Sequence, residues 1–128
     1  MVTEQSSLLY GVELDGKRHF AFSVRLPVVG DTIAALEETQ DEKGTTDGAA
    51  SGMHYRVGIL ARVVTIEGID AEKVTTELLL EQLSDDDFDL IDAQISALKK
   101  KLMALRAPSP DTAASSSPSE NTASPDSK

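Results

Sequence analysis

The run DDDFD at residues 85–89 is the densest group of potential metal ligands in this chain. A calcium loop places such carboxylates ahead of a sharp-turn glycine and a bidentate glutamate. Leu90 stands where the glycine is needed, and Ser96 stands where the glutamate is needed. A helix N-terminus also favours acidic residues, because its unpaired amides carry partial positive charge. We therefore predict that this run caps a helix and binds no metal.

The two histidines, His19 and His54, are the other candidates for metal binding or acid–base catalysis. Neither has His, Asp or Glu around it at the spacing of a ligand set, and we expect both at the surface. Cysteine is absent, which excludes a thiolate nucleophile and a disulfide framework. Glycine-rich phosphate loops, nucleophile elbows and zinc-protease helices are also absent. The sequence predicts a protein that is not an enzyme and uses no cofactor, with a site of carboxylates alone as the catalytic alternative.

The chain has 22 acidic and 12 Lys or Arg residues, which gives a formal net charge of −10. Nucleic acids and anionic membranes recruit basic surfaces, so neither is the expected partner. The first residues lack the basic start and apolar run of a signal peptide. No apolar run approaches the roughly 20 residues that cross a bilayer. We expect a soluble protein of the cytoplasm.

Two segments near the start alternate apolar and polar residues with the period of a strand. The apolar positions are Leu8, Tyr10, Val12 and Leu14, then Phe20, Phe22, Val24 and Leu26. Asp15-Gly16 lies between them and tolerates the positive φ angles of a tight turn. This pattern predicts an antiparallel hairpin with one buried face.

The segment after the hairpin predicts helices joined by a loop. Pro27 closes the second strand, and Gly30-Asp31 offers a turn and cap for a short helix through Ile33, Leu36 and Glu38. Residues 39–52 are polar and glycine-rich, which is typical of a mobile acidic loop. Residues 53–66 carry a broad apolar face that predicts a central helix, although their β-branched content also suits a buried strand. A shorter helix should start near Thr75.

The strongest helical pattern spans residues 84–106. Its apolar positions, spaced alternately three and four apart, are Phe88, Ile91, Ile95, Leu98, Leu102 and Leu105. Ser84 and Asp87 have the spacing of a reciprocal N-terminal cap. Basic residues crowd the other end, where a helix carries partial negative charge. We expect this stripe to pack on the core, and a short coiled coil formed by self-association is the alternative.

The sequence thus predicts an α+β protein, with an N-terminal antiparallel β-hairpin followed by a small helical bundle. Residues 1–106 should form a single domain. Residues 107–128 contain no large apolar residue and hold four of the five prolines. Such a segment cannot bury enough apolar surface to offset the entropy of ordering it, so we predict a disordered Ser/Pro-rich tail.

The order of four motifs resembles a known family. The motifs are LPVVGD at 26–31, ILARVVTIEGI at 59–69, VTTELLLEQLS at 74–84 and DFDLI at 87–91. Together with the hairpin they resemble the tail assembly chaperones of long-tailed bacteriophages and Mu-like prophages, over roughly residues 8–104. The resemblance implies a non-enzymatic protein in the cytoplasm of the bacterial host. It also implies binding to the tape measure protein, which the chaperone keeps soluble until the tail tube protein polymerises and releases it.

An acidic chaperone for an aggregation-prone client needs an apolar surface that accepts an amphipathic helix. We predict that Ile95, Leu98 and Leu102 form this surface, because they lie in the second half of the last helix, away from its capped end. Two alternatives belong to other classes. One is a structural tail or baseplate component of a phage particle, and the other is a small acidic regulatory adaptor whose tail folds on a partner.

Overall fold

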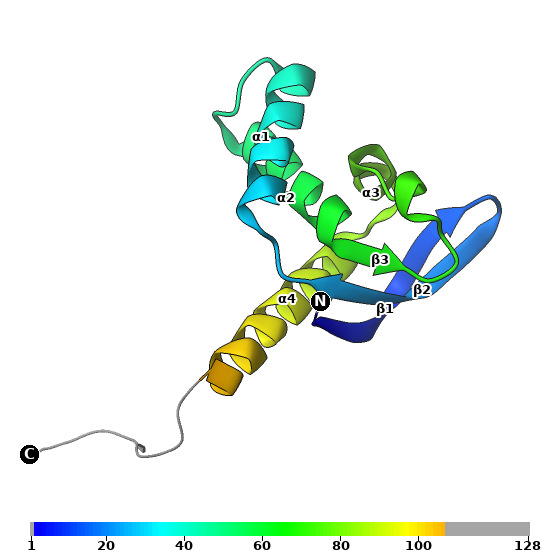
Figure 1. The fold of residues 1–128 in the computed structure, drawn as a ribbon. Helices are drawn as coiled ribbons and strands as arrows, with labels where there is room; N and C mark the ends of the chain where they lie inside the picture. Colours follow the sequence, from blue (N-terminus) through cyan, green and yellow to red (C-terminus); the bar gives the residue numbers. More distant parts are fainter. Residues whose placement is uncertain (1, 107–128) are drawn as a thin grey trace, which may run out of the picture. The chain divides into compact units, whose positions relative to one another are not determined.

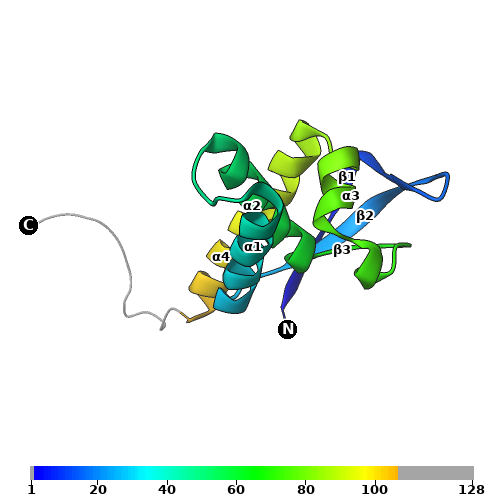
Figure 2. The same ribbon diagram turned by 90° about the horizontal axis from the view of Figure 1, so that it is seen from above.

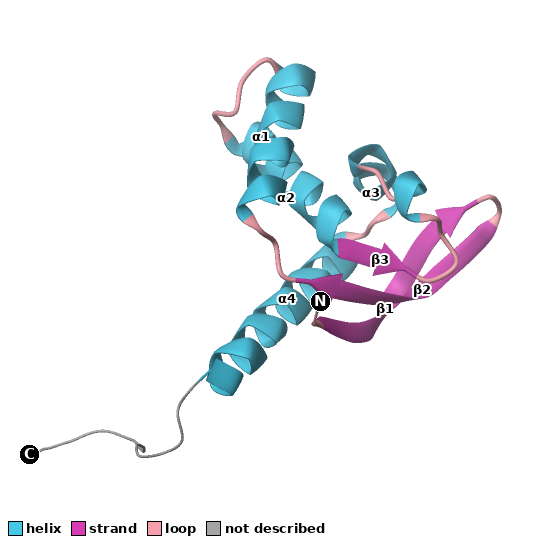
Figure 3. Ribbon diagram, in the orientation of Figure 1, coloured by secondary structure: helices cyan, strands magenta, loops and turns pink. Residues whose placement is uncertain are grey.

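The computed structural model describes residues 2–106. In chain order its elements are β1 (Thr3–Leu14), β2 (Lys17–Arg25), α1 (Val29–Lys43), α2 (Ala49–Val63), β3 (Val64–Ile66), a 3₁₀ turn (Ala71–Lys73), α3 (Thr76–Gln82) and α4 (Asp85–Arg106). Figures 1 and 3 show the antiparallel hairpin followed by the helices. The predicted α+β class is therefore confirmed. The predicted disordered tail, residues 107–128, lies outside the described residues.

The chain divides into two compact units after Leu98, inside α4. The first unit, residues 1–98, contains the sheet, α1 to α3 and the first part of α4. The second unit begins at Lys99, and its described residues continue the helix to Arg106. All the side-chain networks described below belong to the first unit.

The hairpin turn is the one that the sequence predicts. Asp15 and Gly16 both have positive φ angles, of 55° and 78°, between the paired residues Leu14 and Lys17. Two consecutive left-handed residues give a turn whose twist matches that of the strands it joins.

The predicted alternation fails in the middle of β1. The pairing register with β2 shifts between Ser7 and Val12, and Gly11 adopts a φ of 85° within this bulge. From Ser7 to Val12 β1 advances five residues while β2 advances only two, from Ala21 to His19, so three residues of β1 are extra to the regular pairing and the alternation of faces is interrupted. Leu8 and Val12 are buried as expected, whereas Tyr10 is 54% exposed, so the prediction that all three share the buried face is wrong.

β2 is the central strand of a three-stranded antiparallel sheet, with β1 on one side and β3 on the other. The helix predicted over residues 53–66 ends at Val63, and the β-branched residues that follow it form β3. Phe22 and Val24 of β2 and Ile66 of β3 are buried on one face. The sheet thus supplies one wall of the core.

The predicted mobile loop over residues 39–52 is mostly helical. α1 continues to Lys43, where Gly44 ends it in a left-handed conformation and donates its N–H to Gln40. α2 begins at Ala49, after Gly48, so only residues 44–48 link the two helices. Figure 2 shows α1 and α2 side by side. Within this segment Thr39 is buried and pairs with His54 of α2, whereas residues 40–50 are exposed.

The last two helices have the predicted caps in part. Thr75 accepts the N–H of Leu78 at the start of α3, and Ser84 Oγ accepts the N–H of Asp87 in the first turn of α4. The reciprocal half of the α4 cap is absent, because the Asp87 carboxylate binds backbone amides of β1 instead. The stripe of α4 is buried from Phe88 to Leu98.

Candidate partner-binding surface

The outer face of α1 carries an exposed row of large aliphatic side chains. Val29, Ile33 and Leu36 are spaced four and three residues apart and therefore lie on one side of the helix. Their exposed fractions are 75%, 52% and 37%. We call these three residues the α1 stripe. A contiguous row of exposed aliphatic residues differs from scattered surface leucines, because it marks a surface that another molecule can cover.

The inner face of α1 buries small and polar residues, whereas a surface helix normally buries large apolar ones. Its buried residues are Asp31, Ala35 and Thr39, which are small or polar. A surface helix usually turns its apolar stripe toward the core and its polar side chains toward water. In the first half of α1 the polarity is inverted, because Asp31 is buried while Val29, Ile33 and Leu36 face outward. The second half exposes polar residues in the usual way, at Glu37 and residues 40–43.

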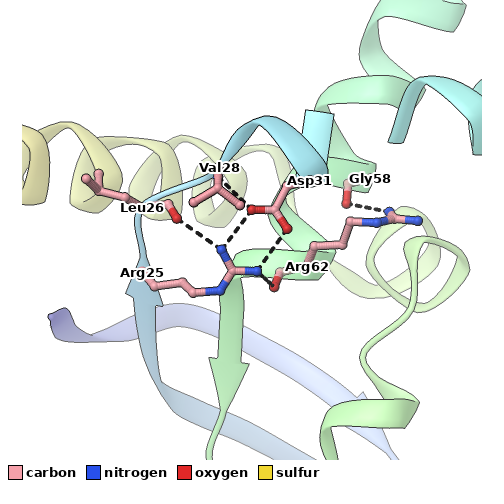
Figure 4. A network of polar contacts seen from close by, with 6 residues as sticks. All are labelled: Arg25, Leu26, Val28, Asp31, Gly58 and Arg62. Carbon is pink, nitrogen blue, oxygen red and sulfur yellow. Dashed lines mark hydrogen bonds and ion pairs between the residues drawn. The ribbon is translucent and has the colours of Figure 1, made fainter. Parts of the chain in front are cut away.

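The N-terminus of α1 is held by an ion pair with the end of β2. The Arg25 guanidinium donates from Nη1 to Asp31 Oδ2 at 2.8 Å and from Nη2 to Asp31 Oδ1 at 2.9 Å. The same guanidinium donates to the carbonyl oxygens of Leu26 at 3.0 Å and Arg62 at 2.9 Å. Figure 4 shows this fork between β2, α1 and the end of α2. A bidentate pair of this kind fixes orientation as well as distance.

The pair also shifts the acid–base behaviour of both partners. The hydrogen bond from Arg25 lowers the pKa of the Asp31 carboxyl, against an opposing effect of burial, and the N–H of Val28 adds to the lowering with a 2.7 Å bond. The same hydrogen bond raises the pKa of Arg25. The Asp31 carboxylate thus accepts the N–H of Val28, just before the first turn of α1, and at the same time binds Arg25 at the end of β2.

A second polar cluster joins α1 to α2 and α3. Glu38 Oε1 accepts from Arg62 Nη1 at 3.0 Å and from Thr76 Oγ1 at 2.8 Å, and Arg62 also donates to the carbonyl of Gly58. Burial raises the pKa of Glu38, but the hydrogen bonds from Thr76 and Arg62 outweigh it, so the pKa lies below its ordinary value. Three helices therefore meet at one carboxylate.

The remaining contact between α1 and α2 is close and fully buried. Thr39 Oγ1 and His54 Nδ1 lie 2.7 Å apart, and both residues are at most 4% exposed. Gly58 faces Ala35, and a Cβ placed on the glycine would lie 3.3 Å from the Ala35 Cβ. The expectation that His54 lies at the surface is wrong, because it pairs with a threonine that has no access to water. His19, the other histidine, is half-buried.

A cavity of about 570 Å³ lies beside the two polar clusters. Arg25, Asp31, Glu38 and Arg62 line it, and all four are engaged in the pairs described above. Charged groups that already satisfy one another gain little from an additional ligand. The arrangement is suited to holding α1 in place.

The structure does not support the exposure predicted for the last helix. Ile95 is 4% exposed and Leu98 is fully buried, so both belong to the core. Leu102 is half-buried. The α4 stripe is buried as far as Leu98. The exposure predicted for the second half of the helix is therefore wrong at Ile95 and Leu98. The exposed stripe lies on α1 instead.

Among residues 2–106, no group of three or more His, Cys, Asp or Glu side chains is placed to hold a metal ion. Within the same described range, no helix is long and apolar enough to cross a membrane. Comparison with family models, with curated proteins and with solved structures finds no match for this chain.

Proposed function

We propose that this protein is a non-catalytic chaperone of phage tail assembly, which holds an amphipathic helix of the tape measure protein against the α1 stripe. The inverted polarity of α1 is the observation that supports the proposal. The exposed residues of the stripe stand at positions i, i+4 and i+7 of α1, which is the spacing of anchor residues in helix–helix recognition: Val29, Ile33 and Leu36. The choice of the tape measure protein as client rests on the resemblance of the four sequence motifs to the phage tail assembly chaperones.

The charge around the stripe favours a client helix with basic residues. Glu37 and Asp41 are exposed and lie along one flank of the α1 stripe, because each is offset by about 80–120° from Val29 at 100° per residue. A client helix with Lys or Arg beside its apolar row would bring opposite charges together. The net charge of −10 would keep such a complex soluble.

The rigid mounting of α1 also suits a binding surface. The Arg25–Asp31 pair fixes its first turn, and Glu38 and Thr39 fix its inner side to neighbouring helices. A surface that is already ordered loses less conformational entropy when a partner binds. The stripe is thus presented in the geometry in which a helix would meet it.

Co-expression with the tape measure protein, followed by co-purification, tests the proposal. The wild-type chain should keep the client soluble and retain it on a column. Ile33→Asp should lose the client, because the substitution places a charge in the centre of the stripe. Leu80→Asp is the matched control, since Leu80 is similarly exposed, at 47%, but lies on α3. Equal retention by both variants would count against the α1 stripe as the client site.

The location of the protein separates a chaperone from a structural tail or baseplate component. A chaperone that is released when the tail tube protein polymerises should be missing from purified mature particles. A structural component should be present there at fixed copy number. Quantitative mass spectrometry of purified particles therefore decides between the two classes.

A further inference from the structure

The α1 stripe is nearly symmetric about its middle residue. Val29 precedes Ile33 by four positions, and Leu36 follows it by three. If two copies of α1 are laid antiparallel with the two Ile33 side chains at the centre, Val29 of each copy comes opposite Leu36 of the other. The offset between these two is about 1.5 Å along the axis, the rise of one residue. Each aliphatic side chain of the stripe then meets an aliphatic side chain.

The side of α1 next to the stripe, which carries Glu37 and Gly30, is also complementary to the same side of a second copy in this arrangement. Glu37 and Gly30 lie on the same side of the row, at about 80° and 100° from Val29. In an antiparallel pair related by a two-fold axis, the same flank of each helix meets, so Glu37 of one copy approaches Gly30 of the other. Nothing lies within 4 Å of the position where a Gly30 side chain would begin. The carboxylate therefore has room beside the positive end of the helix.

We propose that a second copy of this chain covers the α1 stripe, in an antiparallel and two-fold symmetric pair of α1 helices centred on Ile33. Two-fold pairs are the commonest closed arrangement of identical chains, because a single self-complementary patch suffices. A parallel pair would align the two helix dipoles and bring opposite flanks together, and it would leave Glu37 without the partner's N-terminus. The antiparallel pair opposes the dipoles.

The contact is small, since each copy contributes three aliphatic residues, and it should be transient and dependent on concentration. The charge of −10 on each chain opposes association at low salt, whereas salt screens this repulsion and leaves the apolar contact in place. The pair occupies the surface that we propose for the client. It would keep the stripe from water while no client is bound, but the inference itself requires no client.

Cysteine crosslinking of the full chain tests the position and direction of the pair, because the natural sequence contains no cysteine. Oxidised Ile33→Cys should give a disulfide-linked dimer about tenfold or more faster than Leu80→Cys at equal concentration, since a docked pair raises the effective concentration of the thiols. Leu80→Cys reports random collision, because Leu80 is exposed on a different helix.

Two further variants distinguish the antiparallel from the parallel pair. In the antiparallel pair the two Val29 positions lie about 12 Å apart along the axis, beyond the reach of about 7 Å for a disulfide. Val29→Cys alone should therefore crosslink slowly, and a mixture of Val29→Cys with Leu36→Cys should crosslink fast. Fast crosslinking of Val29→Cys alone would overturn the antiparallel arrangement.

Sedimentation equilibrium gives a measurement that does not depend on cysteine. The mass should rise from 13.7 kDa toward twice that value as the protein concentration increases. The rise should be steeper in about 0.5 M than in about 0.05 M NaCl, because the higher salt screens the repulsion between the two acidic chains. Ile33→Asp should stay monomeric while circular dichroism shows it folded, and Leu80→Asp should behave as wild type. A wild-type mass that stays at 13.7 kDa, or association that survives Ile33→Asp, would overturn the proposal. Client co-purification is measured separately, so failure of the pair leaves the test of function unaffected.

Discussion

The Asp87 carboxylate accepts the backbone N–H of Gly11 at 3.1 Å and so ties the first turn of α4 to the bulge in β1. The same carboxylate accepts the N–H groups of Tyr10 at 3.0 Å and Leu9 at 2.6 Å. Asp87 is fully buried, and the residues that it joins are more than 75 positions apart. One side chain thus satisfies three amides that the bulge removes from the strand ladder.

Asp87→Ala should therefore destabilise the protein by about 3 kcal/mol, because an unpaired buried amide costs about 1–3 kcal/mol, and the variant leaves the buried amide of Gly11 and the partly buried amides of Leu9 and Tyr10 without their acceptor. Asp87→Asn should cost less, since the amide oxygen still accepts one or two of these hydrogen bonds. Urea unfolding followed by circular dichroism measures both. The neighbouring Asp86 provides the control, because it is exposed and its contact with β1 is a long, exposed hydrogen bond of 3.4 Å from the Tyr10 hydroxyl, so Asp86→Ala should change stability by less than about 0.5 kcal/mol. Equal stability of the two alanine variants would contradict the role given to Asp87.

Gly11→Ala should destabilise the same bulge for a different reason. The φ of 85° at this position costs an L-residue about 1–2 kcal/mol. In addition, a Cβ would lie 3.0 Å from both the His19 carbonyl oxygen and the Phe20 ring. The midpoint of urea unfolding should fall without a change of slope. Gly44→Ala is the matched control: its φ is 77° but nothing lies within 4 Å, so it should show the conformational cost alone. A smaller loss for Gly11→Ala than for Gly44→Ala would exclude the steric contribution.

The lowered pKa of Asp31 predicts a dependence of stability on acid. Its pKa lies below the unfolded value of about 3.9, so its stabilising effect is present above that pH and is lost as the pH falls through the folded pKa. Asp31→Asn should cost about 3 kcal/mol at pH 7, the lower end for breaking a largely buried pair. The gap between variant and wild type should shrink below about pH 4, as wild-type Asp31 becomes protonated.

Unfolding free energies measured between neutral and acidic pH would give this comparison. Glu37→Gln is a suitable control, because Glu37 is exposed on the outer face of α1 and no cluster holds it. A gap between Asp31→Asn and wild type that stays constant down to about pH 2 would mean that the carboxylate charge of Asp31 does not stabilise the fold.

Local chemistry made the hairpin turn and the ends of the last helices predictable. Asp15-Gly16 needs only its own backbone preference, and Thr75 and Ser84 need only an amide three positions away. The burial of Phe88 and Ile91 in the first half of the α4 stripe followed from its period alone, whereas Ile95 and Leu98 were predicted at a partner surface and are buried. Each of these features depends on residues close together in the sequence, so the pattern contains the necessary information.

The features that the sequence did not reveal depend on distant partners. Residues 39–43 looked like a loop because they are polar, but Thr39 is buried against His54 from another helix. The bulge that exposes Tyr10 is stabilised by Asp87, far along the chain. The α1 stripe was visible as apolar positions, yet its exposure follows from the Arg25–Asp31 pair, which commits the opposite face of the helix to the core. Arg25 and Asp31 are only six positions apart, but Glu38 and Thr39 hold the same face inward through partners 15 to 38 positions away.

Two substitutions by aspartate should separate the exposed stripe from the buried one. Ile33→Asp should change the free energy of unfolding by less than about 1 kcal/mol, because Ile33 is 52% exposed and its replacement remains hydrated. Leu98→Asp should cost more than about 4 kcal/mol, since it places an unpaired charge at a fully buried position. Urea denaturation and thermal melts of the two variants make the comparison. If Leu98→Asp stays as stable as Ile33→Asp, Leu98 is accessible to water and the second half of α4 returns as a candidate partner surface.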